Sequence, residues 1–130
     1  MISFIYRIII LTLFACVCFG ALADDHSESK AIINRFFVYL KADNIDELRT
    51  ILSPGRYENY SKQGVWETWI NTWKRCTPIE LGAVTEQKSY LRKDRDKTVN
   101  VKVTYDCGGQ KLVGSINISL INGKWLWDEN

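Results

Sequence analysis

The chain has 130 residues, of which 46% are hydrophobic and 25% charged, and its 17 basic and 15 acidic side chains give a net charge of +2. This charge is too small and too evenly balanced to favour a nucleic acid or an anionic membrane surface as a partner. The length suits one domain, because no repeat, low-complexity segment or Pro/Gly/Ser-rich linker divides the chain.

The first 23 residues have the pattern of an export signal. One basic residue, Arg7, precedes a long apolar run, and Ala21 and Ala23 place small side chains at the positions that a signal peptidase reads. Cleavage after Ala23 removes one charged residue and leaves residues 24–130 with a net charge of +1. We therefore expect a signal peptide at 1–23, an extracytoplasmic (periplasmic or secreted) location, and no membrane attachment after cleavage.

Two other interpretations of this segment are weaker. A retained membrane anchor would need roughly 20 apolar residues, but the stretch from Ile8 to Ala23 is shorter and no basic stop-transfer cluster follows it. A lipoprotein signal would use Cys16, but Phe14 is too bulky for its position in a lipobox and the apolar run continues beyond the cysteine. A soluble exported protein is the preferred prediction.

Two helices are expected at the start of the domain. Ser27 is a suitable N-cap for a helix that ends near Ala42. Asn44 caps a second, shorter helix, in which Glu47 completes a pattern like a capping box, and Ser-Pro-Gly at 53–55 ends it. The apolar stripe of the first helix consists of Ile32, Ile33, Phe36, Tyr39 and Leu40.

A third helix is expected from near Ser61 to a stop at Pro78. Its tryptophans, Trp66, Trp69 and Trp73, lie on one helical face. A stripe of this kind is more often part of a core than a wall on which a ligand stacks. We expect Trp69 and Trp73 to pack on the sheet and Trp66 to be partly exposed.

The second half of the chain alternates apolar and polar residues with a period of two, as strands do. Strands are expected at 79–91, 99–106, 112–120 and 125–127, joined by a charged turn at 92–97 and by two-residue turns at Gly108-Gly109 and Asn122-Gly123.

These turns predict the register of the sheet. The pairs they create are Tyr105 with Leu112, Val101 with Ile116, Leu120 with Trp125, and Ile118 with Trp127. This register puts the large apolar side chains on one face, whereas a slip by one residue would expose half of them. We therefore predict an α+β fold in which N-terminal helices pack on one face of a four-stranded antiparallel meander sheet.

This order of elements, with the final hairpin Asn122-Gly123-Lys124-Trp125-Leu126-Trp127, resembles the nuclear transport factor 2-like superfamily, and most of all its small secreted members of unknown function. The resemblance covers roughly residues 28–128 of a single domain at 24–130. It implies a cone in which a curved sheet bends around a long helix and leaves a pocket at the open end. Members include isomerases, dehydratases, toxin-immunity proteins and binding or assembly modules, so the fold alone does not decide the function.

Catalytic members of that superfamily use an aspartate base with tyrosine donors, or an Asp/His pair, inside the cone. Here the single histidine, His26, lies before the stretch that carries the resemblance, and Asp106 lies on the polar face of its strand. We therefore assign no catalytic residue and expect no cofactor. The residues expected to line a ligand site at the cone and its mouth are Tyr57, Tyr60, Trp66 and Tyr105.

Cys76 and Cys107 are the only cysteines after residue 23, and export makes a disulfide between them the favoured prediction. A pairing of Leu81 with Cys107 across the sheet would bring Cys76 close. The alternative is a pair of free, buried thiols. Redox catalysis is disfavoured because the chain has no Cys-x-x-Cys motif after the signal.

Cleavage after Ala23 would also create an amino-terminal metal site. The new α-amino group, the amides of Asp25 and His26, and one imidazole nitrogen can surround one ion in a square plane, and Asp24 contributes only its backbone. This geometry suits Cu(II) or Ni(II). The alternative is a frayed terminus in which the position of the histidine is accidental.

Two classes of function follow. The first is an exported, non-catalytic binding or interaction domain, which takes a small apolar ligand in its cone or a protein partner, as an immunity or inhibitor protein does. The second is a small isomerase- or dehydratase-like enzyme that uses the pocket tyrosines. A carboxylate buried beside those tyrosines would favour the enzyme, whereas an all-apolar or closed cone would favour a binding or structural role.

Overall fold

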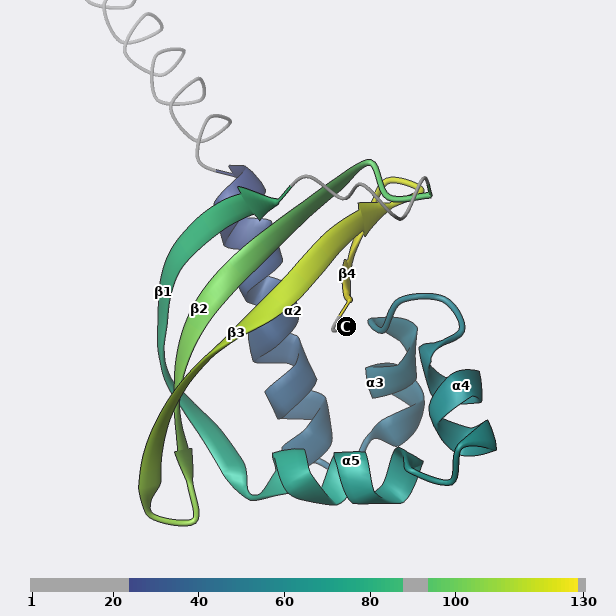
Figure 1. Ribbon diagram of the computed structural model, residues 1–130, viewed down its shortest axis with the longest axis vertical. Helices are drawn as coiled ribbons and strands as arrows, with labels where there is room; N and C mark the ends of the chain where they lie inside the picture. Colours follow the sequence, from purple (N-terminus) through teal and green to yellow (C-terminus); the bar gives the residue numbers. More distant parts are fainter. Residues whose placement is uncertain (1–23, 88–93, 129–130) are drawn as a thin grey trace, which may run out of the picture.

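A computed structural model describes residues 24–87 and 94–128 and has the α+β architecture expected from the sequence. The four helices of these residues pack on one face of a curved four-stranded antiparallel sheet with the strand order β1-β2-β3-β4 (Figure 1). The elements are α2 (Asp24–Lys41), α3 (Ile45–Thr50), α4 (Arg56–Lys62), α5 (Trp66–Lys74), β1 (Cys76–Gln87), β2 (Lys97–Cys107), β3 (Gln110–Ile121) and β4 (Lys124–Trp127).

The long helix α2 runs along the concave face of the sheet, and α5 crosses its end (Figure 1). Ser27 lies inside α2, so its expected role as N-cap is wrong. Asn44 does occupy the N-cap position of α3, but its side chain caps no backbone group. Its own N–H donates to Tyr39 O (2.9 Å) in the turn that ends α2, so this N–H already has an acceptor. This bond removes the donor that Glu47 needs for a capping box.

The third expected helix is two helices. Gly64 has a φ of +70° between α4 and α5, a conformation that glycine adopts without strain. The N–H of Val65 then donates to Tyr60 O (3.0 Å), which closes a tight connection between the two helices. Ser61 therefore lies within α4, and Pro78 lies in β1, beyond the end of α5.

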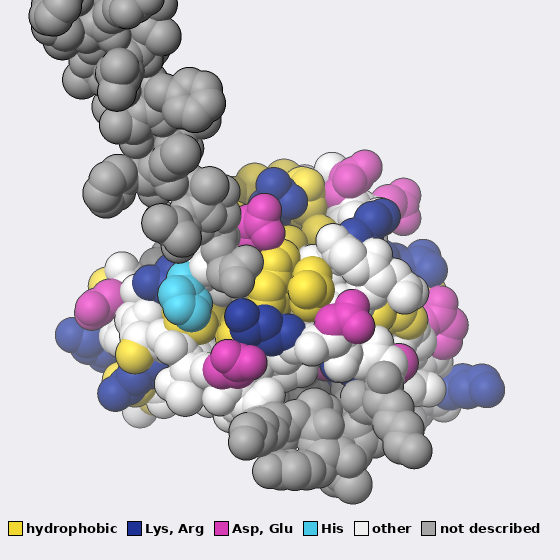
Figure 2. Space-filling view, turned by 90° about the horizontal axis from the view of Figure 1, so that it is seen from above, with side chains coloured by type: hydrophobic (Ala, Val, Ile, Leu, Met, Phe, Trp, Pro, Cys, Tyr) yellow, Lys and Arg dark blue, Asp and Glu magenta, His cyan; other side chains and the backbone are white. Residues whose placement is uncertain are grey.

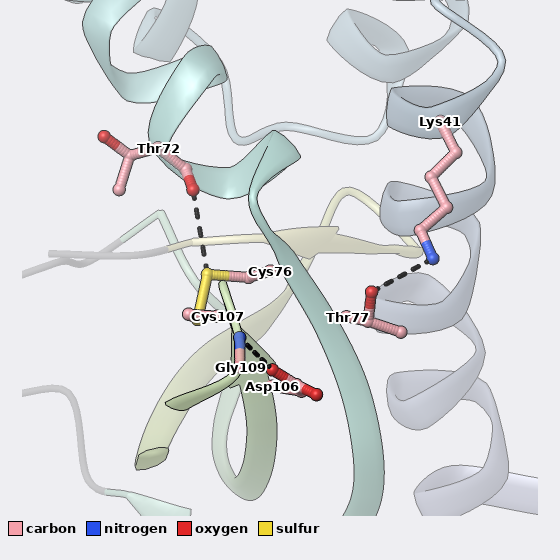
Figure 3. Close-up of a disulfide and its surroundings, with 7 residues drawn as sticks. All are labelled: Lys41, Thr72, Cys76, Thr77, Asp106, Cys107 and Gly109. Carbon is pink, nitrogen blue, oxygen red and sulfur yellow. Dashed lines mark hydrogen bonds between the residues drawn. A yellow bond between two sulfur atoms is a disulfide. The ribbon is translucent and has the colours of Figure 1, made fainter. Parts of the chain in front are cut away.

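The disulfide between Cys76 and Cys107 is present, although the strand pairing expected around it is wrong (Figure 3). β1 begins at Cys76, three residues earlier than expected, so the two cysteines are themselves cross-strand partners and Leu81 pairs with Val103. Irregularities between Pro78 and Glu80, and again between Leu81 and Val84, shift the register along this strand. The expected end of the strand and part of the charged turn, at 88–93, lie outside the described residues.

Both two-residue turns set the register that the sequence predicts. Tyr105 pairs with Leu112 and Val101 with Ile116 across β2 and β3. Ile118 pairs with Trp127 and Leu120 with Trp125 across β3 and β4. Both residues of each turn have positive φ, as type I′ turns require, at Gly108, Gly109, Asn122 and Gly123.

Aromatic side chains fill the space between α2 and the sheet. Trp127 is 0% exposed and stacks on the buried ring of Phe36 with a centroid separation of 4.0 Å. Trp73 meets Trp127 edge to face at 5.5 Å, and the half-buried Trp69 and Trp73 both pack against the buried core, as expected. Phe37, which is not part of the predicted stripe, is buried as well. The space beneath the curved sheet, where the resemblance implies the interior of a cone, is thus filled by the side chains of the protein itself.

The segment between α3 and α4 continues the sheet beyond β4. Trp127 N donates to Ile51 O (2.7 Å), and Ser53 N donates to Trp127 O (2.8 Å). Leu52 and Trp127 form a parallel bridge there. The last strand is therefore bonded on both sides, which fixes Trp127 at the centre of the core.

The expected signal peptide at 1–23 lies outside the described residues. Within 24–87 and 94–128, no helix combines the length and the apolar character needed to cross a membrane. The disulfide is compatible with an extracytoplasmic location, since such bonds persist in oxidising compartments.

Candidate functional site

Three of the four expected ligand-binding residues come together on α4 and α5. Tyr57 meets Trp66 edge to face at 4.8 Å. Tyr60 meets Trp69 at 5.2 Å, and Trp66 lies 5.6 Å from Trp69. We call Tyr57, Tyr60 and Trp66 the aromatic surface; all three side chains are half-buried. The tight connection at Gly64 brings these residues of two successive helices side by side.

Two arginines lie against the aromatic surface. The guanidinium of Arg49 lies 3.5 Å from the centre of the Tyr57 ring, and that of Arg56 lies 5.4 Å from the centre of the Tyr60 ring. Arg56 Nη1 also donates to the hydroxyl of Tyr60 (3.3 Å). Sequence reasoning missed both residues. The spacing of four between Arg56 and Tyr60 was a usable signal, because such residues meet on a helix. Arg49 lies on another helix, so no sequence spacing indicated its contact with Tyr57.

A groove of about 330 Å³ adjoins the aromatic surface at Tyr57. It lies along α3, the 51–55 segment and α4, and both signs of charge are represented in its walls. The other lining residues are Asp46, Arg49, Thr50, Leu52, Ser53, Pro54, Gly55 and Glu58. An open groove with charged walls suits a polypeptide better than a small apolar molecule, which prefers an enclosed, apolar pocket.

A buried polar cluster joins the end of β4 to α4 and to the start of β2. Arg95 Nε and Nη2 each donate to a carboxylate oxygen of Asp128 (3.0 Å each). Ser119 Oγ donates to Asp128 Oδ2 (2.6 Å) and shares a hydrogen bond with Thr98 Oγ1 (2.7 Å). Arg56 Nη2 lies 3.6 Å from Asp128 Oδ1. The hydrogen bond to Asp128 raises the pKa of Arg95 above its ordinary value, against the opposing effect of burial.

This cluster is a structural tie and not a reaction centre. Asp128 is 3% exposed and Ser119 is fully buried, so a substrate has no access to either group. The carboxylate also accepts hydrogen bonds from a guanidinium and a hydroxyl at the same time. Sequence reasoning missed Asp128, because its contacts with Arg95 and Arg56 arise only once the chain has folded.

Tyr105 lies away from the aromatic surface, near the disulfide. Its ring is buried, 5.4 Å from that of Trp73 and 6.2 Å from that of Phe37. It lines an apolar groove of about 250 Å³ between the end of α5 and the β2–β3 hairpin. The other lining residues are Thr72, Trp73, Cys76, Cys107, Leu112, Val113 and Gly114. The four expected ligand-binding residues therefore belong to two separate places.

A third groove, of about 310 Å³, separates α2 from β4. Its walls include the charged residues Glu28, Arg35 and Lys124 beside the half-buried Trp125. On the face seen in Figure 2, hydrophobic side chains gather near the centre with basic and acidic side chains around them. This mixture is typical of an ordinary protein surface and indicates no ligand class.

The expected amino-terminal metal site is only partly described. His26 is exposed in α2, and Ser29 Oγ donates to its carbonyl oxygen (3.0 Å). The side chains of Asp24 and Asp25 lie outside the described part. Elsewhere in 24–87 and 94–128, no three His, Cys, Asp or Glu side chains lie together as metal ligands would. The amino-terminal copper or nickel site stays a prediction.

Comparison with protein-family models and with curated proteins finds no significant match to this sequence. The relation to the nuclear transport factor 2-like superfamily therefore stays a prediction. What the structure shows is the α+β architecture, which is compatible with many functions.

Proposed function

We propose that the protein is an exported, non-catalytic interaction domain that binds another protein through the aromatic surface. The observation that carries this proposal is the position of the aromatic side chains. Trp127 and Phe36 fill the cone, whereas Tyr57, Tyr60 and Trp66 remain accessible on its outside. A ligand that enters the cone would have to displace the core, but a partner that lies on the outside would not.

The residue types of the aromatic surface support a protein partner. Tryptophan, tyrosine and arginine are the side chains most enriched among the residues that dominate binding energy in protein interfaces. Arg49 over Tyr57 and Arg56 beside Tyr60 hold the rings in place before binding, which lowers the entropy lost on association. An immunity or inhibitor protein that guards against an exported toxin is the specific form of this function that we favour.

The enzyme alternative has less support. The hydroxyl of Tyr60 accepts a hydrogen bond from Arg56, and arginine is not a general base because it keeps its proton. The buried carboxylate, Asp128, is held by Arg95 and closed to solvent. An isomerase or dehydratase would need a carboxylate or imidazole that faces both a tyrosine and the substrate.

The test is affinity capture from the native extracytoplasmic fraction with the exported protein as bait. A partner held through the aromatic surface should be captured by the unaltered protein and weakened at least tenfold by Trp66→Ala or Tyr57→Ala, since one interface anchor contributes more than about 1.4 kcal/mol. Val38→Ala is the matched control, because Val38 is an exposed apolar residue of α2. A partner that binds all variants equally would exclude this surface, and steady turnover of a small substrate by the protein would contradict the proposal itself.

A further inference from the structure

Among the described residues, 24–87 and 94–128, no strand pairs with the outer edge of the first half of β3. β4 pairs only with Ile118–Ile121, and the next backbone group, Asn117 O, accepts from Asp128 N (2.8 Å). The two-residue turn makes Cys107 and Gln110 a hydrogen-bonded pair, so alternate residues of β3 bond to β2 and those between them face outward. Lys111, Val113 and Ser115 therefore turn their N–H and C=O groups toward the open side.

The opposite edge of the sheet, on β1, is protected in the usual ways. Pro78 has no N–H to offer, and two irregularities interrupt the strand. α2 also contacts this strand, where Lys41 Nζ donates to Thr77 Oγ1 (3.2 Å; Figure 3). The open stretch of β3 contains neither a proline nor a register shift, and its Leu112 and Val113 are 42% and 63% exposed. Unprotected edges of this kind pair with another strand.

We propose that the occupant of this edge is a second copy of the same chain, paired antiparallel with Val113 on the two-fold axis. In this register the backbone N–H and C=O groups of Val113 form hydrogen bonds with those of Val113 of the second copy. On either side of the axis, the same groups of Lys111 form hydrogen bonds with those of Ser115. Every outward N–H and C=O of these three residues then has a partner, and no two lysines face each other. Centring the axis on Lys111 would juxtapose like charges, and centring it on Ser115 would leave Lys111 unpaired.

The side chains fit the same register. Leu112 faces Gly114 of the second copy in a non-hydrogen-bonded pair, where side chains approach most closely. Gly114 leaves a gap beside Tyr105, whose Cε2 atom would lie 3.5 Å from a Cβ at that position. This gap belongs to the apolar groove of about 250 Å³ formed with Trp73 and the disulfide. The exposed leucine of each copy thus covers the apolar groove of the other.

The contact involves few residues of each chain, so the dimer is weaker than one with an interface of standard size and forms reversibly with concentration. It lies apart from the aromatic surface and does not depend on the function proposed for that surface.

Sedimentation velocity of the exported protein over a series of concentrations tests the proposal. We expect a monomer–dimer equilibrium that Val113→Pro shifts to the monomer, while the circular dichroism spectrum is retained, because the lost N–H faces outward. Gly114→Ala should weaken the dimer as well, since its methyl group occupies the place of the leucine at ordinary contact distance from Tyr105. Ile79→Ala, which removes a residue that is 56% exposed on β1, should change nothing.

Cysteine cross-linking tests the register. Val113→Cys places the two sulfur-bearing residues at about 5.5 Å between Cα atoms, within disulfide range, so covalent dimers should form under mild oxidation. Lys111→Cys is the matched control, because residue 111 faces residue 115 and not itself. A protein that stays monomeric at all concentrations, a dimer that survives both edge variants, or equal cross-linking at 111 and 113 would each overturn the proposal.

Discussion

Replacement of Trp127 by alanine is the most direct test of the filled cone. The indole is 0% exposed, stacks on Phe36 and meets Trp69 and Trp73 edge to face. Tryptophan-to-alanine substitutions in cores cost about 3–5 kcal/mol, and the loss is greater where the surroundings cannot collapse. The backbone N–H and C=O of residue 127 both bond to the 51–53 segment, at Ile51 and Ser53, and β3 pairs with the other side of the strand. We therefore expect a loss of about 4–5 kcal/mol.

This loss is a large share of the stability of a domain of this size, which is about 5–15 kcal/mol. It corresponds to a fall in Tm of roughly 16–40 °C, at about 4–8 °C per kcal/mol. Urea denaturation followed by circular dichroism measures the free energy of unfolding directly. Trp125→Ala is the matched control, because Trp125 lies two residues away on the same strand face but is only half-buried, so its loss should be clearly smaller.

The variant should also gain a property. An apolar cavity lined by Phe36, Phe37, Trp69 and Trp73 should stay dry and take up an aromatic molecule, as engineered core cavities do. Indole at about 100 times its dissociation constant would restore about 2.7 kcal/mol. If Trp127→Ala does not fold, Trp127→Phe keeps a ring against Phe36 and permits the same comparison. A loss below about 1 kcal/mol, or equal losses for Trp125→Ala and Trp127→Ala, would refute the filled cone and return the ligand site to its interior.

Three further predictions concern the covalent and polar ties. Mass spectrometry without reductant should show Cys76 linked to Cys107, and Cys76→Ala should lower the free energy of unfolding by about 3.7 kcal/mol, the loop-entropy value for a separation of 31 residues; freely alkylated thiols would contradict it. Asp128→Asn should cost about 1.5–3 kcal/mol, because it removes the carboxylate that accepts two hydrogen bonds from the half-buried Arg95, while Asp94 still pairs with that guanidinium. The guanidinium of Arg95 is charged at both about pH 6 and about pH 10, because its pKa is raised above its ordinary value. The loss of stability should therefore be equal at the two pH values of about 6 and about 10, and a loss that vanishes at the higher pH would show another origin. After signal cleavage, calorimetric titration with Cu(II) should show one tight equivalent that weakens as the pH falls and is lost in His26→Ala; copper binding that survives this change would exclude the amino-terminal site.

The sheet was predictable from the sequence where short-range rules decide it. Each of the two-residue turns, at Gly108-Gly109 and Asn122-Gly123, permits a single register of the strands that it joins. The alternation of apolar and polar residues selects the same register independently. β1 lacked such a constraint, because it follows a helix directly and its irregularities leave no mark on its weak apolar pattern. The break at Gly64 was missed because apolar and aromatic residues on both sides continue a helical pattern.

The candidate site was predictable only in part, for a related reason. Tyr57, Tyr60 and Trp66 are close in sequence, so local structure alone brings them together. The contact of Arg49 with Tyr57 and that of Arg56 with Asp128 join different elements and leave no local pattern, whereas the spacing of four between Arg56 and Tyr60 was a local signal that was missed. Tyr105 was expected beside the other tyrosines because it faces the interior, but its place along the strand puts it at the disulfide end.

The bonds that Trp127 makes to Ile51 and Ser53 also bear on the order of folding. Its partners on α2 and in the segment after α3 lie more than seventy positions earlier in the chain, and those on α5 lie more than fifty positions earlier. Contacts so distant in sequence form late, because a long loop must close first. On the export route that we propose, the chain would emerge from its amino-terminal end, with its helices before the indole that completes their core. The native core would then be complete only once β4 had crossed, and this topology would keep the chain unfolded during that passage.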